Sequence, residues 1–110
     1  MTDRTFGAEV IEVPDDTRLR MHGDLDGAAD DELTSAYREV ATLGAPRLTL
    51  DFGEVGYINS TGIALVVRLL ADARRDGRGV RALGLTPHYQ EIFRITRLSD
   101  FMDIVEGDAA

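Results

Sequence analysis

Residues 47–74 read RLTLDFGEVGYINSTGIALVVRLLADAR, and this stretch holds the two patterns that decide the fold. Its first part, Arg47–Phe52, alternates apolar and polar residues, so that Leu48, Leu50 and Phe52 share one face of a predicted strand. The glycine-bounded segment Gly53–Gly56 is expected to be a turn. The first part of the stretch is therefore expected to be a strand followed by a loop.

The second part of the stretch predicts a strongly apolar helix over Thr61–Arg74. Apolar residues recur in it at helical spacing, and we expect its main buried stripe to contain Ile63, Val66, Val67 and Leu70. Leu65 and Leu69 widen this stripe. Little of this helix is therefore expected to face water.

The flanking segments continue the alternation of strands and helices. Before the central stretch we expect a hairpin, made of strands at Glu9–Val13 and Thr17–His22 joined by a Pro14-Asp15-Asp16 turn. A break at Gly23–Gly27 and a helix at Ala28–Leu43 follow. After it we expect a strand at Val80–Leu85 and a helix at Thr86–Phe93 that starts with Thr86-Pro87. A turn at Thr96–Asp100 and a strand at Met102–Val105 complete the chain.

The resulting order is β-β-α-β-α-β-α-β, which predicts an α/β fold with helices packed on a mixed sheet. The first two strands pair as a hairpin, and the later strands, each separated by a helix, are expected to be parallel. The chain has 110 residues and no linker or repeat. We therefore expect one domain over residues 1–110, with its core at about residues 9–105.

Composition narrows the classes of partner. The formal net charge is −8, which disfavours binding to nucleic acid or to an anionic membrane surface and favours a protein partner with a basic face. The chain contains no cysteine, which excludes disulfides and thiolate metal sites. The opening MTDRTFGAEV has no apolar signal-peptide region, so we expect a cytoplasmic protein.

The tetrapeptide Asn59-Ser60-Thr61-Gly62 lies where the predicted loop enters the apolar helix. Asn59 is a good N-cap residue, which would place Ser60 and Thr61 in the first turn. Free backbone N–H groups and the positive end of the helix dipole favour an anion there, including a phosphate on a hydroxyl. The alternative is that these residues only cap the helix.

A second polar segment, Gly23-Asp24-Leu25-Asp26, follows the second predicted strand. Two carboxylates one residue apart could bind a metal or act as acid and base, but no other metal-ligand pattern accompanies them, and a solvated turn is the alternative. Ser60 lacks the Gly-x-Ser-x-Gly elbow of a hydrolase, and no cofactor fingerprint occurs. We therefore expect no enzyme activity, no cofactor and no metal.

Taken in order, these segments resemble the STAS domain family, specifically the stand-alone bacterial anti-sigma factor antagonists. The resemblance covers about Glu9 to Val105 and is carried by four segments: Gly23–Asp26, Leu48–Phe52, Tyr57–Ile63, and the closing helix and turn with Thr86-Pro87, Phe93, Thr96 and Leu98. It implies partner switching, in which the antagonist binds an anti-sigma factor that is also a serine kinase. Phosphorylation releases the antagonist, and a serine phosphatase resets it.

The resemblance also assigns roles to individual residues. Ser60 would be the phosphorylated residue, with Thr61 as the lesser candidate. The partner-binding surface would consist of Asp24, Asp26, Asn59, Ser60, Thr61, Gly62, Ile63 and Ala64. The oligomeric state is left open.

Two positions depart from the pattern of the family. Asn59 stands where the family usually has aspartate, and Arg97 stands where it often has glycine. Asn59 leaves open a second interpretation, a STAS scaffold or accessory subunit of a signalling or lipid-transport complex that is not phosphorylated. Arg97 concerns only the geometry of the closing turn.

Overall fold

The central strand, β3 (Arg47–Ile58), lies in the middle of a five-stranded sheet whose order is β1-β2-β3-β4-β5. The computed structural model describes residues 4–105, so residues 1–3 and 106–110 of the predicted domain lie outside it. The other strands and the helices are β1 (Gly7–Val13), β2 (Asp16–Leu25), α1 (Asp30–Leu43), α2 (Ser60–Arg75), β4 (Gly79–Leu83), α3 (Pro87–Ile95) and β5 (Asp103–Ile104), with short 3-10 helices η1 (Gly27–Ala29) and η2 (Leu98–Asp100).

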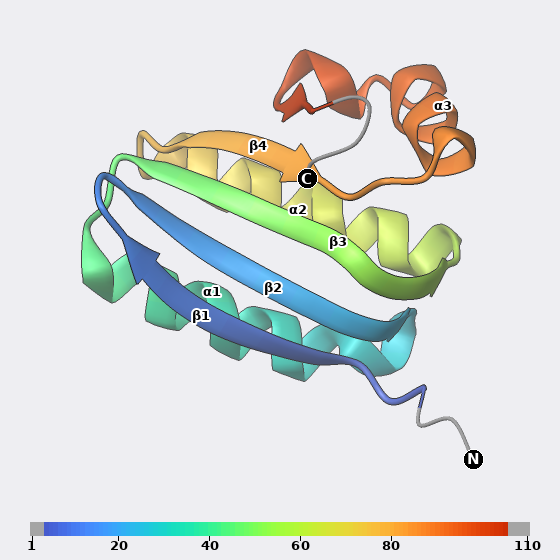
Figure 1. The fold of residues 1–110 in the computed structure, drawn as a ribbon, viewed down its shortest axis with the longest axis horizontal. Coiled ribbons are helices and arrows are strands. Elements are labelled where there is room, and N and C mark those ends of the chain that lie inside the picture. Colours follow the sequence, from blue (N-terminus) through green and yellow to red (C-terminus); the bar gives the residue numbers. More distant parts are fainter. Residues whose placement is uncertain (1–3, 106–110) are drawn as a thin grey trace.

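The sheet is mixed, as the element order predicts. Strand β1 pairs antiparallel with β2, and every later neighbour pair is parallel. Right-handed crossovers that advance in one direction across a sheet place their helices on the same face. Accordingly α1 and α2 both lie behind the sheet in Figure 1, while α3 and η2 lie beyond β4, on the side of the sheet where β5 pairs. Among the described residues 4–105, no helix lies on the opposite face of the sheet.

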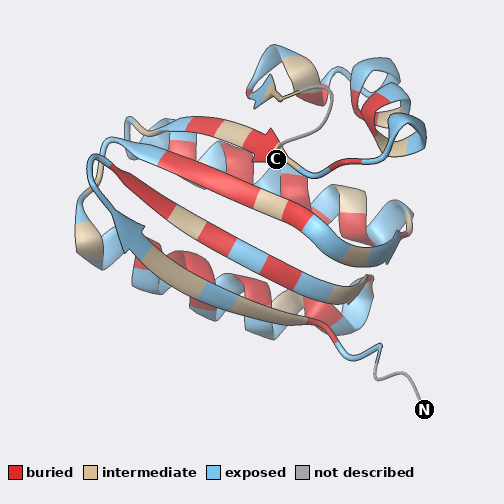
Figure 2. Cartoon of the chain, in the orientation of Figure 1, coloured by how far each residue is buried: buried red, intermediate tan, exposed pale blue. Residues whose placement is uncertain are grey.

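The alternation read from the sequence correctly identifies the face of the sheet that is buried. Leu19 pairs with Leu50, and both lie under the helices with no more than 1% of their surface exposed. Figure 2 shows the resulting bands of buried and exposed residues along β2 and β3. The core between sheet and helices is completed by Met21, Leu25, Leu33, Val40, Leu48, Phe52, Val66, Leu69 and Phe93.

Two predicted breaks are wrong, because the strands continue through them. Strand β2 runs on through Gly23 to Leu25, and β3 runs through the predicted Gly53–Gly56 turn to Ile58. The two extensions pair with each other in parallel, across register shifts, and end with Leu25 opposite Ile58. Backbone pairing outweighs the turn preference of the glycines here, because both strands extend together.

The buried face of α2 is also rotated from the prediction. Val66 and Leu70 are buried as expected, but Val67 is 47% exposed. The face that packs on the sheet instead consists of Gly62, Leu65, Val66, Leu69, Leu70 and Ala73. The reason is that α2 is apolar on more than one side, so its periodicity alone does not select the face that the sheet covers.

The predicted start of the last helix is confirmed, although this helix runs to Ile95 and not to Phe93, and α1 starts at Asp30 and not at Ala28. The Thr86 side chain accepts a hydrogen bond from the Tyr89 N–H, and Pro87 occupies the first turn of α3. Gly44 ends α1 in the left-handed conformation, with φ of 73°. Arg97 adopts the same conformation, with φ of 68°, at the turn between α3 and η2. This is the backbone geometry that glycine adopts most easily, and here an arginine adopts it.

Candidate functional site

The centre of the site is the N-terminus of α2, where the extended β3 ends. Asn59 caps the helix as predicted: its Oδ1 accepts a hydrogen bond of 2.8 Å from the Gly62 N–H. Ser60 and Thr61 therefore fall in the first helical turn, and both are exposed. The Ser60 hydroxyl is thus presented to solvent beside the positive end of a 16-residue helix.

Gly62 determines how closely α2 approaches the sheet. A Cβ atom at this position would lie 2.0 Å from the backbone oxygen of Leu25 and 3.2 Å from the Ile58 side chain. The Asn59 N–H donates to the same Leu25 oxygen at 3.2 Å. The backbones at the end of β2 and at the start of α2 are therefore in direct contact, next to Ser60 and Thr61.

The two predicted carboxylates flank this junction, each with its own partner. Asp24 lies in β2 opposite Tyr57, and its carboxylate forms an ion pair of 2.8 Å with the guanidinium of Arg4. Asp26 caps η1 by accepting a hydrogen bond of 3.0 Å from the Ala28 N–H. Arg4 thus balances the charge of Asp24, whereas the hydrogen bond at Asp26 comes from a neutral group and leaves that charge in place.

The start of α3 supports the site from the other side. The backbone N–H of Ile58, two residues before Ser60, donates a hydrogen bond of 2.9 Å to the hydroxyl of Tyr89. Ile58 itself is buried, so its N–H has little access to water as an alternative partner. Tyr89 therefore helps to hold the backbone from which the Ser60 loop leaves the sheet.

We expect Tyr89→Phe to lower the free energy of unfolding by about 1 kcal/mol, because the Ile58 N–H loses its acceptor. Urea denaturation measures this change. The matched control is Tyr57→Phe, since the Tyr57 side chain is 48% exposed. Equal losses in the two variants would show that the Tyr89 hydroxyl does not support the backbone at Ile58.

A charged contact ties the outer side of α2 to α1. The Arg68 guanidinium donates to the Asp30 carboxylate and, at 2.8 Å, to the Thr34 hydroxyl. The hydrogen bond from Arg68 lowers the pKa of Asp30 below its ordinary value. Because this pair is exposed, it orients the two helices more than it stabilises them.

The arrangement suits modification and protein contact. The hydroxyls of Ser60 and Thr61 stand on an open surface formed by the ends of β2 and β3, η1 and the first turn of α2. Within residues 4–105, no three His, Asp or Glu side chains are grouped so that they could hold a metal ion. In the same range, no helix has the length and apolar character needed to cross a bilayer.

The predicted residues lie close together in the structure, but they differ in exposure. Ser60, Thr61 and Ala64 are exposed and Ile63 is half-buried, whereas Gly62 is buried against Leu25. Sequence reasoning missed Arg4 and Tyr89. Both reach the site through contacts distant in sequence, and no local pattern in the chain indicates them.

Comparison with known proteins places this geometry in context. The family described as "Mlab, STAS domain" matches residues 9–106. An anti-sigma-B factor antagonist from Staphylococcus epidermidis is 27% identical over 99 residues, which is 90% of this chain and 92% of that protein.

Two solved structures show the same fold. An anti-sigma factor antagonist from Mycobacterium paratuberculosis aligns with a TM-score of 0.77 at 18% identity, over 96% of this chain and 90% of that one. The Bacillus cell fate determinant SpoIIAA in its phosphorylated form aligns with a TM-score of 0.67 at 18% identity, over 93% and 92%. At these identities the likeness concerns the fold alone.

Proposed function

We propose, from the premise that this chain belongs to the STAS domain family, that it is a cytoplasmic anti-sigma factor antagonist switched off by phosphorylation of Ser60. Its partner would be an anti-sigma factor with serine kinase activity, and a serine phosphatase would reset it. The chain itself would not be an enzyme. The observation that carries this proposal is the exposed Ser60 hydroxyl in the capped first turn of α2.

The names of relatives support the proposal. The matching Staphylococcus epidermidis protein is named an anti-sigma-B factor antagonist, and one structure with this fold is of a protein in phosphorylated form. The partner would bind the surface formed by Asp24, Asp26, Asn59, Ser60, Thr61, Gly62, Ile63 and Ala64. Asp24 and Gly62 would act there mainly by shaping the backbone, because the carboxylate of Asp24 is paired and Gly62 is buried.

The proposed reaction transfers one phosphoryl group. The Ser60 Oγ would attack the γ-phosphorus of ATP held by the kinase, the bond to the β–γ bridging oxygen would break, and the hydroxyl proton would leave. The products would be ADP and phosphoserine, and the phosphatase would use water to return serine and inorganic phosphate. The added phosphate carries about −1.5 to −2 charges at neutral pH. This charge would arise at the centre of the contact surface and weaken the complex.

To test phosphorylation, the chain is incubated with ATP and with the anti-sigma factor kinase of the same organism. Peptide mass spectrometry then locates the phosphate. We expect one phosphate, located on Ser60. Ser60→Ala should take up none, and Thr61→Ala should be modified like the wild type. Phosphate on Thr61 alone, or equal incorporation in the Ser60→Ala variant, would contradict the assignment.

A second function is favoured by one observation, the presence of asparagine at position 59. Asn59 keeps the cap through its Oδ1 but carries no charge beside the hydroxyl. A STAS scaffold or accessory subunit of a signalling or lipid-transport complex needs the folded surface and no phosphate. A stable complex isolated from the native cells, with Ser60 and Thr61 unmodified under all growth conditions, would favour this function.

A further inference from the structure

Helix α2 has a second, largely apolar face that stays exposed in the described chain. Every member of the row Ser60, Ala64, Val67, Ala71 and Arg74 is exposed. These positions follow helical spacing, so they form one line opposite the face that packs on the sheet. The line is about 21 Å long, because each residue rises by about 1.5 Å. It begins at the proposed phosphorylation site.

The neighbouring helix α1 has a different composition on its exposed side. The exposed positions of α1 are mostly polar and include Asp31, Glu32, Arg38 and Glu39. The exposed row of α2, by contrast, contains two alanines and a valine between its polar ends. The small side chains of Ala64 and Ala71 would let the backbone of another helix approach closely.

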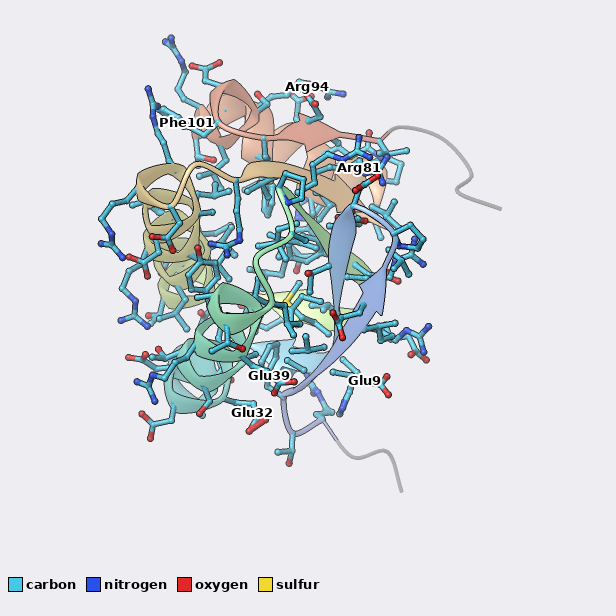
Figure 3. The ribbon with its side chains drawn as sticks, turned by 90° about the vertical axis from the view of Figure 1, so that its left-hand side faces the viewer. Glu9, Glu32, Glu39, Arg81, Arg94 and Phe101 are labelled. Carbon is cyan, nitrogen blue, oxygen red and sulfur yellow. The ribbon has the colours of Figure 1, made fainter. Side chains whose placement is uncertain are left out.

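The far end of the row opens into an apolar hollow of about 250 Å³ between α2 and η2. Its walls include Val67, Leu70, Ala71, Arg74, Leu98 and Phe101. Phe101 is 52% exposed, and in Figure 3 it lies above the end of α2, away from Glu32 and Glu39 on α1. A hollow of this size can receive one or two large apolar side chains.

The charges around the row indicate the chemistry of its partner. From Ser60 to Ala71 α2 contains no acidic residue, although the chain has 20 acidic residues. Among residues 4–105, Arg74 takes part in no ion pair, and its guanidinium lies 5.4 Å from the centre of the Phe101 ring. Arg74 also borders a hollow lined by Asp100 and Asp103, so its surroundings suit a single partner carboxylate and not an acidic patch.

We propose that this row and hollow, which we call the α2 docking face, bind a helix of the anti-sigma factor that carries an apolar stripe and one carboxylate opposite Arg74. The inference rests on the proposed function and extends its contact surface from Ser60 along α2 to Phe101. A large apolar side chain of the partner fills the hollow, and a carboxylate pairs with Arg74. The face also explains why Val67 is apolar although it is 47% exposed.

The test measures the affinity of the purified chain for its purified anti-sigma factor kinase by titration calorimetry, without ATP. We expect Ala71→Glu, Phe101→Ala and Arg74→Glu each to weaken binding about tenfold or more, as central interface substitutions do. Ala41→Glu on α1 is the matched control, since Ala41 is also an exposed helical alanine. It should change the affinity by less than about twofold.

Hydrogen exchange of the wild-type complex provides a readout that does not depend on variants. Added protection in residues 64–75 and 98–101 on binding is expected. Full affinity of all three variants, alongside weak binding of Ser60→Asp, would overturn the docking face and leave the proposed function standing. Full affinity of Ser60→Asp would instead overturn the proposed function. A dimer of this chain that Ala71→Glu dissolves would assign the face to a second copy and also overturn the proposal.

Discussion

Gly62→Ala is expected to lower the free energy of unfolding by about 3 kcal/mol, at the upper end of the usual cost of overpacking. The added methyl group would lie 2.0 Å from the backbone oxygen of Leu25, and neither backbone can yield without separating α2 from β2. Helix propensity alone predicts the opposite sign, because alanine is favoured over glycine within helices by about 1 kcal/mol. The measured sign therefore decides which effect dominates.

Urea denaturation of this variant is best compared with Gly56→Ala. A Cβ at Gly56 would meet its nearest neighbour, the Asp24 carboxylate, at 3.6 Å, an ordinary contact distance. We expect that control to change stability by less than about 1 kcal/mol. If Gly62→Ala were as stable as the wild type, the close packing of α2 on the end of β2 would be contradicted.

Ser60→Asp is expected to weaken binding to the anti-sigma factor about tenfold or more. One charge at about 6 Å from a partner carboxylate costs roughly 0.7 kcal/mol in water and roughly 3 kcal/mol at an effective dielectric constant near 20. Each 1.4 kcal/mol corresponds to about a tenfold change in affinity. Phosphoserine carries up to twice that charge, so it should weaken the complex further.

Two controls separate charge from size and position. Ser60→Asn has nearly the shape of Ser60→Asp without its charge, and Ser60→Ala removes the hydroxyl alone. We expect both to bind within about tenfold of the wild type, and the difference between the aspartate and asparagine variants to shrink at high salt. Equal weakening by aspartate and asparagine would show that bulk, and not charge, disturbs the contact.

Local sequence patterns predicted most of the fold. The alternation of apolar residues in β3 identified the buried face of the sheet, and Asn59 and Thr86 marked the starts of two helices. These features depend on residues adjacent in sequence, which is why they could be read without the structure. The predicted phosphorylation and partner-binding residues remain a proposal.

The errors arose where distant segments decide the outcome. The glycines of β3 suggested a turn, but pairing with the end of β2 keeps that segment extended. The apolar character of α2 suggested burial of Val67, but only the packing of the whole helix selects its buried face. The ion pair of Arg4 with Asp24 joins the segment before β1 to β2, and no periodicity connects these two residues.

The central claim is that phosphorylation of Ser60 controls the contact with the anti-sigma factor. The most direct test uses the chain fully phosphorylated on Ser60 and the unmodified chain. The dissociation constant of each form for the same purified anti-sigma factor is measured with no ATP present. Our account predicts that phosphorylation raises the dissociation constant between about tenfold and a thousandfold while the fold is retained. Equal affinity of the two forms would contradict it.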